Sequence, residues 1–201
     1  MTKRYSPLDV SRPSTRLLEL LPGPFDSEIE CKLHNASLDE HPQYEAVSYC
    51  WGEPPKDKVI RLADRLVSLG DNLFSALRHL RHPDKPRILW ADALCIDQDD
   101  VEEKTQQVQI MGQIYTGCTQ CLIWLGDISE SIDEGTGFSL NDAKVVFDLL
   151  RLFACEEPSD ELPATLCHPL QRAQAARTIA GMMSWGNEWW RRIWTVQVSG
   201  S

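Results

Sequence analysis

The sequence predicts an α/β fold in which a mostly parallel sheet is flanked by helices. Apolar strand segments and amphipathic helical segments alternate between residues 44 and 125, and strand, helix, strand is the pattern of parallel crossover units. Alternating segments flank a turn within residues 16–33 and again within residues 58–69, which adds β-hairpins near the N-terminus. The 201 residues, of which 42% are hydrophobic, can fill the core of one domain.

The N-terminal elements are expected to be extended. Residues 16–20 and 28–33 lie on either side of a turn rich in Pro and Gly, and residues 58–62 and 65–69 alternate around a two-residue turn. Between these hairpins, residues 44–49 form the first strongly apolar strand. Prolines follow shortly after that strand, so the chain must leave the sheet there.

Two helices and two further strands complete the predicted sheet. Asp71 is expected to cap a helix that extends to about Leu80. Residues 87–94 and 120–125 are predicted to be buried strands.

The helix between those two strands is expected to start at an Asp cap. The cap is either Asp99 with Glu102 or Asp100 with Glu103, because both pairs have the spacing of a capping box. The apolar stripe of this helix is expected to consist of Val101, Val108, Met111 and Tyr115.

The remainder of the chain begins with an acidic stretch. Residues 127–161 are expected to form a solvated insertion. Further helices are predicted at residues 141–154 and 170–183, and residues 189–197 can open a last helix.

Charge and hydropathy limit the partners. The net charge of −10 repels a phosphate backbone, so we expect no nucleic-acid partner. Residues 1–15 lack the apolar region of a signal peptide and are expected to be a flexible segment. No stretch approaches the roughly 18 apolar residues that span a bilayer, so we expect a cytoplasmic protein with no membrane partner.

The cysteines are expected to be reduced. Seven cysteines without framework spacing are typical of free thiols in a reducing compartment. Cys118 and Cys121 have the spacing of half a zinc site, but no second pair supplies the other ligands. Two small thiols at the entry to a buried strand are the better interpretation, and no metal site is predicted.

Four blocks of sequence, in this order and spacing, resemble the HET (heterokaryon incompatibility) domain of fungi. They are residues 44–52 (Tyr-Glu-Ala-Val-Ser-Tyr-Cys-Trp-Gly), residues 89–98 (Leu-Trp-Ala-Asp-Ala-Leu-Cys-Ile-Asp-Gln), the set Gln107, Val108, Met111, Ile114, Tyr115, Trp124 and Gly126, and residues 189–197 (Trp-Trp-Arg-Arg-Ile-Trp-Thr-Val-Gln). The resemblance implies one HET domain over residues 16–201. A domain cut short within its C-terminal helix is compatible with this resemblance.

The resemblance also implies a TIR-like, flavodoxin-like fold and two functions. Some TIR-like domains cleave NAD at its nicotinamide bond, and others only associate with partners in cell-death or immune signalling. The fold alone does not choose between them. We therefore expect a signalling module in incompatibility and programmed cell death that acts through self-association or partner association, with an active NAD glycohydrolase as the alternative. NAD would be a substrate, and no cofactor is expected.

A ligand cleft is predicted at the carboxyl edge of the sheet, where open α/β sheets bind ligands. Its expected members follow two strands that should be parallel neighbours, with one residue added from the final helix. They are Tyr49, Trp51, Gly52, Asp92, Cys95, Asp97, Gln98 and Trp194. Purely structural interpretations stay open: Trp51 can cover the core, and Asp92, which we expect to be buried, can cap amides of its own loop.

The candidate catalytic acids are Asp92 and Glu103. Glu103 and Gln107 are four residues apart on one helix, so both can face the cleft, although a solvated helix face is the somewhat better interpretation. NAD-cleaving TIR domains carry a Glu four residues after a Trp, and here Trp194 is followed at that spacing by Val198. An apolar side chain cannot stabilise a cationic transition state, which leaves NAD cleavage uncertain.

Overall fold

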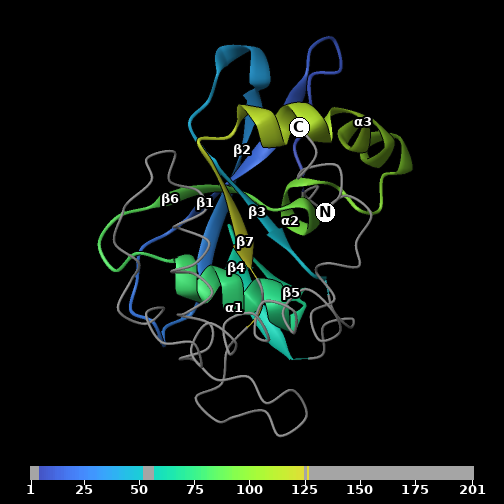
Figure 1. Cartoon of the computed structure of the whole chain (residues 1–201). Coiled ribbons are helices and arrows are strands. Elements are labelled where there is room, and N and C mark those ends of the chain that lie inside the picture. The colour runs from blue at the N-terminus through green and yellow to red at the C-terminus, as the bar shows by residue number, and fades with distance from the viewer. Residues whose placement is uncertain (1–4, 52–56, 125, 127–201) are drawn as a thin grey trace, which may run out of the picture. The chain divides into compact units, whose positions relative to one another are not determined.

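Figure 1 shows the computed structural model, in which residues 5–51, 57–124 and 126 are described. The chain divides into two compact units, residues 1–126 with 196–201 and residues 127–195. Every described residue belongs to the first unit. The helices predicted at residues 141–154, 170–183 and 189–197 lie outside the described residues.

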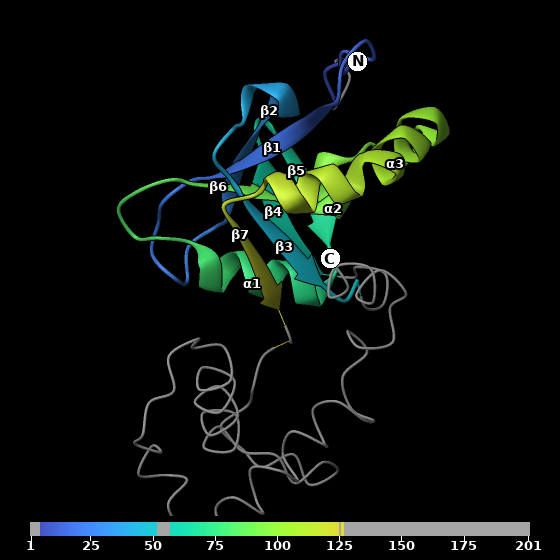
Figure 2. The same cartoon turned by 45° about the horizontal axis from the view of Figure 1, so that its top comes forward.

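The first unit is built on a seven-stranded sheet in the order β5-β4-β2-β1-β6-β3-β7. Its strands are β1 (Ser14–Leu20), β2 (Glu30–Ser37), β3 (Glu45–Tyr49), β4 (Lys58–Leu62), β5 (Arg65–Leu69), β6 (Arg87–Trp90) and β7 (Gln120–Trp124). Its helices are the 3-10 helix η1 (Leu38–Glu40), α1 (Asp71–Leu80), α2 (Asp92–Cys95) and α3 (Val101–Gly117). Figures 1 and 2 both show α1 and α3 apart, with strands of the sheet between them.

The sheet is mixed, so the expectation of a mostly parallel sheet is wrong. Three pairings are parallel, β2 with β4 and β3 with both β6 and β7. Three are antiparallel, β1 with both β2 and β6, and β4 with β5. The crossover pattern was correct for β3, β6 and β7. However, the two predicted hairpins form part of the same sheet, and β1 runs antiparallel to β6 at the junction.

The strand predicted at residues 87–94 is shorter than expected. β6 ends at Trp90, and the next residues turn into the short helix α2 because the amides of Leu94 and Cys95 both donate to the carbonyl of Ala91. A short apolar run fits a buried strand and a buried helix equally well, since periodicity does not separate them.

The two longer helices exist where predicted; the predicted cap of α1 is wrong, and one of the two caps predicted for α3 is confirmed. Gly70 is the N-cap of α1, so Asp71 is its first residue rather than its cap. Asp100 caps α3, and its Oδ1 accepts from the amides of Glu102 and Glu103 at 3.1 and 3.0 Å.

The apolar stripe predicted on α3 is wrong in its first half. Val101 and Val108 are 75% and 48% exposed, whereas Gln107 and Ile114 are buried. The face toward the sheet therefore begins with polar side chains. Met111 and Tyr115 do pack against the core.

Candidate functional site

Two predicted site loops meet at one edge of the sheet. β3 and β6 are parallel neighbours, with Glu45 opposite Leu89 and Ala46 opposite Trp90. The loops that follow these strands therefore share the carboxyl edge of the sheet, as the sequence predicted.

Trp51, Asp92 and Gln98 come together at this edge. The indole Nε1 of Trp51 donates to Oδ2 of Asp92 at 2.9 Å, and Nε2 of Gln98 donates to the backbone carbonyl of Asp92 at 3.0 Å. These three residues meet as predicted, and the ligand cleft at this position stays a prediction. We call them the edge cluster.

Asp92 is half-buried, so the expectation that it is buried is wrong. It sits at the start of α2, where its Oδ1 also accepts from the amide of Ala93 at 2.8 Å. The carboxylate therefore accepts from an amide of its own loop, as the structural interpretation expected, and it also contacts Trp51.

The edge cluster has an accessible aromatic surface and a buried acceptor. The Trp51 residue is 39% exposed. The Oε1 atom of Gln98 is buried and accepts no hydrogen bond in the described part of the chain. The ring of Trp51 is thus accessible to a bound group, whereas the amide oxygen of Gln98 lies beneath the surface.

Three other predicted site residues have roles in the core or in the loop. Tyr49 is 4% exposed and belongs to the hydrophobic core. Cys95 is fully buried, and loss of solvation raises the pKa of its thiol to about 12. Asp97 stabilises its loop by accepting from the amide of Asp99 at 3.2 Å. Gly52, Trp194 and Val198 lie outside the described residues.

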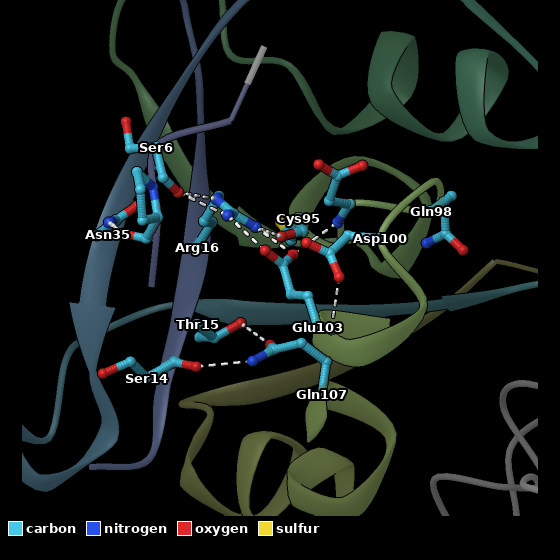
Figure 3. Close-up of polar contacts among 12 residues, drawn as sticks. Ser6, Ser14, Thr15, Arg16, Asn35, Cys95, Gln98, Asp100, Glu103 and Gln107 are labelled. Atoms are coloured by element: carbon cyan, nitrogen blue, oxygen red, sulfur yellow. Dashed lines mark hydrogen bonds and ion pairs between the residues drawn. The ribbon is translucent and has the colours of Figure 1, made fainter. Parts of the chain in front are cut away.

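Glu103 forms an ion pair with Arg16 on β1. The guanidinium Nη1 and Nη2 donate to the two carboxylate oxygens at 2.5 and 2.8 Å (Figure 3). Burial alone would raise the pKa of Glu103, but the hydrogen bonds from Arg16 and from the amide of Asp97, together with the Arg16 charge, hold the pKa below its usual value. The expectation of a solvated helix face is therefore wrong for Glu103.

This ion pair also positions the loop of the edge cluster. Arg16 Nη1 donates to the carbonyl of Cys95 at 3.2 Å, and Glu103 Oε1 accepts from the amide of Asp97 at 2.7 Å. The two partners thus bind the backbone on both sides of Ile96, next to Gln98. No local sequence pattern predicts this role of Arg16, because the residue lies in a strand distant from the loop in the chain.

Gln107 lies in a second buried network between α3 and β1. Its Nε2 donates to the carbonyl of Ser14, and its Oε1 accepts from the hydroxyl of Thr15, both at 2.8 Å (Figure 3). The indole of Trp90 donates to the same hydroxyl at 3.0 Å. Gln107 therefore connects α3 to β1. None of these hydrogen bonds is made with a residue of the edge cluster.

The described cysteines are free thiols. They are Cys31, Cys50, Cys95, Cys118 and Cys121. Within residues 5–51, 57–124 and 126, no group of three or more His, Cys, Asp or Glu side chains could hold a metal ion. In the same residues, no helix is long and apolar enough to cross a membrane.

The fold and the edge cluster define the class of protein. It is a mixed α/β domain in which an exposed indole and a carboxylate meet where two parallel strands end. The family model for heterokaryon incompatibility proteins matches residues 44–197, which include every member of the edge cluster. The chain belongs to this HET family.

A curated relative supports the membership. The chain is 36% identical over 138 residues, 61% of its length, to heterokaryon incompatibility protein 6, OR allele, of Neurospora crassa. It spans about a fifth of the length of that relative. No solved structure matches the chain.

Proposed function

We propose that this chain acts in heterokaryon incompatibility as a cytoplasmic signalling module that associates with protein partners through the edge cluster. Family membership supports the biological role, together with the name of the Neurospora relative. The observation that carries the site is the half-exposed indole of Trp51 hydrogen-bonded to Asp92.

A tryptophan in this situation is well suited to a protein interface. Trp is enriched among the residues that contribute most to binding, because it covers a large apolar area with few rotatable bonds. The bond to Asp92 fixes the ring before a partner arrives, which lowers the entropy lost on binding. Asp92 and Gln98 add polar groups that can select the partner.

The test is a growth assay in a filamentous fungus that expresses the whole protein. Trp51→Ala should abolish or strongly reduce the growth arrest of an incompatible combination. Val108→Ala, another exposed apolar residue but on α3, should leave it unchanged. Equal protein levels must be verified by immunoblot. An undiminished response in Trp51→Ala would refute the edge cluster as the association site.

NAD cleavage is a second candidate function. It is favoured by the position of the edge cluster at the carboxyl ends of β3 and β6, where open α/β sheets bind nucleotides and other ligands. In this function, Asp92 is the acid placed to contact the substrate, and Trp51 can stack on a ring. Glu103 is less suited to act on a substrate, because its carboxylate is already ion-paired with Arg16.

Nicotinamide release from NAD separates the two functions. Sustained turnover by the purified protein that is lost in Asp92→Asn would refute association as the sole activity. If the protein is inactive, Val198→Glu restores the acid that the TIR resemblance places at that position. A folded Val198→Glu protein that releases no nicotinamide argues for association alone.

A further inference from the structure

The β5 strand forms one end of the described sheet. It pairs with β4 in five consecutive antiparallel positions, from Leu62 opposite Arg65 to Lys58 opposite Leu69. No described strand pairs with its other side. Hydrogen-bonded and non-bonded pairs alternate from the two-residue turn outward. The backbone groups of Leu66 and Ser68 therefore point away from β4, toward the edge.

Among the described residues, this edge has neither a proline nor a bulge to prevent strand addition. Natural edge strands are blocked by proline, by a bulge or by a charge directed inward. β5 reads Arg-Leu-Val-Ser-Leu, without proline, and its register with β4 is uninterrupted. On the inward face, Val67 and Leu69 are apolar and buried, and Arg65, next to the turn, is exposed; Leu66 on the outer face is 64% exposed.

We propose that β5 is a homodimerisation surface, on which the β5 strand of a second copy adds antiparallel about a two-fold axis at Val67. In this register, Leu66 lies opposite Ser68 of the second copy, and Ser68 lies opposite its Leu66. Both are residues whose backbone groups face the edge, so each pair can exchange two hydrogen bonds. The two sheets become one continuous sheet.

The outer face of the joined strands is also self-complementary. Ser68 has Val59 of β4 as its other neighbour, and Val59 is 39% exposed. Leu66 of the second copy therefore lies two strands away from Val59, with the small side chain of Ser68 between them. The symmetry axis repeats this arrangement, so two leucines and two valines lie on the outer face of the junction.

Charge favours a second copy over a charged partner. The chain carries a net charge of −10, which opposes self-association over most of its surface. The hairpin and its flanks, residues 57–71, contain three acidic residues (Asp57, Asp64, Asp71) and three basic residues (Lys58, Arg61, Arg65) and are neutral. Two copies can approach here without net repulsion. The surface does not include the edge cluster, so the proposal is independent of the function assigned to Trp51.

Sedimentation velocity of the 201-residue chain over a range of concentrations tests the proposal. The wild type should dimerise. Leu66→Lys places two like charges beside the symmetry axis and should raise the dimer dissociation constant about tenfold or more. Val101→Lys, at a more exposed position on α3, is the matched control and should dimerise like the wild type. A monomeric wild type, or a Leu66→Lys protein that dimerises normally, overturns the proposal.

Amide hydrogen exchange tests the register. In the dimer, the amides of Leu66 and Ser68 should exchange slowly, and in Leu66→Lys they should exchange rapidly. The Val67 amide, which faces β4, should be protected in both proteins and reports an intact hairpin. Rapid exchange at Leu66 and Ser68 in the dimer overturns the proposal. So does slow exchange in a monomer, because another part of the same chain would then cover the edge.

Discussion

Arg16 on β1 and Glu103 on α3 form a doubly hydrogen-bonded ion pair whose side chains are 1% and 13% exposed. Arg16 also donates to the carbonyl of Ser6, at 2.6 Å through Nη2 and 3.2 Å through Nε. One buried cation thus joins the N-terminal segment, the first strand, the loop of the edge cluster and the start of α3. Removing either partner should therefore affect more than one contact.

Glu103→Gln should strongly destabilise the first unit. The amide leaves Arg16 as a buried cation without a counter-charge, so we expect the free energy of unfolding to fall by about 3 kcal/mol. Urea denaturation measures this change. Glu102→Gln, the exposed neighbour on the same turn, should stay within about 0.5 kcal/mol of the wild type. Equal losses in the two variants would show that the ion pair contributes nothing specific.

The contribution of Glu103 should disappear in acid. The pKa of Glu103 in the folded protein lies below 4.5, the ordinary value for a glutamate side chain. A carboxyl group with a lowered folded pKa stabilises the fold above its unfolded pKa, and this contribution is lost as the pH falls through the folded pKa. The stability difference between the wild type and Glu103→Gln should be constant near neutral pH and shrink below about pH 4.5. Urea titrations across this range measure it, and a difference that does not shrink as the pH falls below about 4.5 would contradict the assignment.

Gln107→Ala should be far more harmful than the same change one residue earlier. It leaves the carbonyl of Ser14 and the hydroxyl of Thr15 without the bonds that Gln107 supplies, and an unsatisfied buried polar group costs about 1–3 kcal/mol. Gln106 is exposed, so Gln106→Ala is the control. The midpoints of thermal unfolding compare the two variants. If both midpoints shift equally, helix propensity and not the buried network explains the effect.

The thiols should react in an order set by burial. Burial, and secondarily the neighbouring Cys95, raises the pKa of Cys31 to about 12, and burial does the same for Cys95. Because the thiolate is the reactive form, iodoacetamide should modify the half-buried Cys50 in the native protein before either of them. In denaturant, all seven cysteines should be modified. Mass spectrometry reads both patterns, and early modification of Cys95 or cysteines protected in denaturant would contradict them.

The hydrogen bond between Trp51 and Asp92 should restrain the indole. Asp92→Ala removes the acceptor, so exchange of the Trp51 indole proton should accelerate about fivefold or more. Asp92→Asn retains an acceptor oxygen and should exchange at an intermediate rate. NMR measures the exchange, with Trp51→Phe identifying the signal. An unchanged rate in Asp92→Ala would mean that this bond does not hold the ring in solution.

The family, the local elements and the meeting of the edge-cluster residues could all be predicted from the amino-acid sequence. Turn residues and alternation predicted the hairpin strands, helical spacing predicted α1, and capping chemistry restricted the start of α3 to two aspartates. These features depend on neighbours in the chain, so they can be read from local sequence. The convergence of Trp51, Asp92 and Gln98 followed from one rule, that parallel strands end at the same edge.

The completion of the sheet and the choice of buried polar residues depend on contacts between segments that are distant in the chain. β1 pairs with both β2 and β6, and this arrangement made the sheet mixed. Because α3 packs near that strand, its buried face carries Gln107 and an ion-paired Glu103 in place of Val101 and Val108. A periodicity argument places apolar residues inward, but it cannot identify a polar side chain whose partners come from a strand about 90 residues away in sequence. Burial of such groups depends on hydrogen bonds that exist only after distant segments meet.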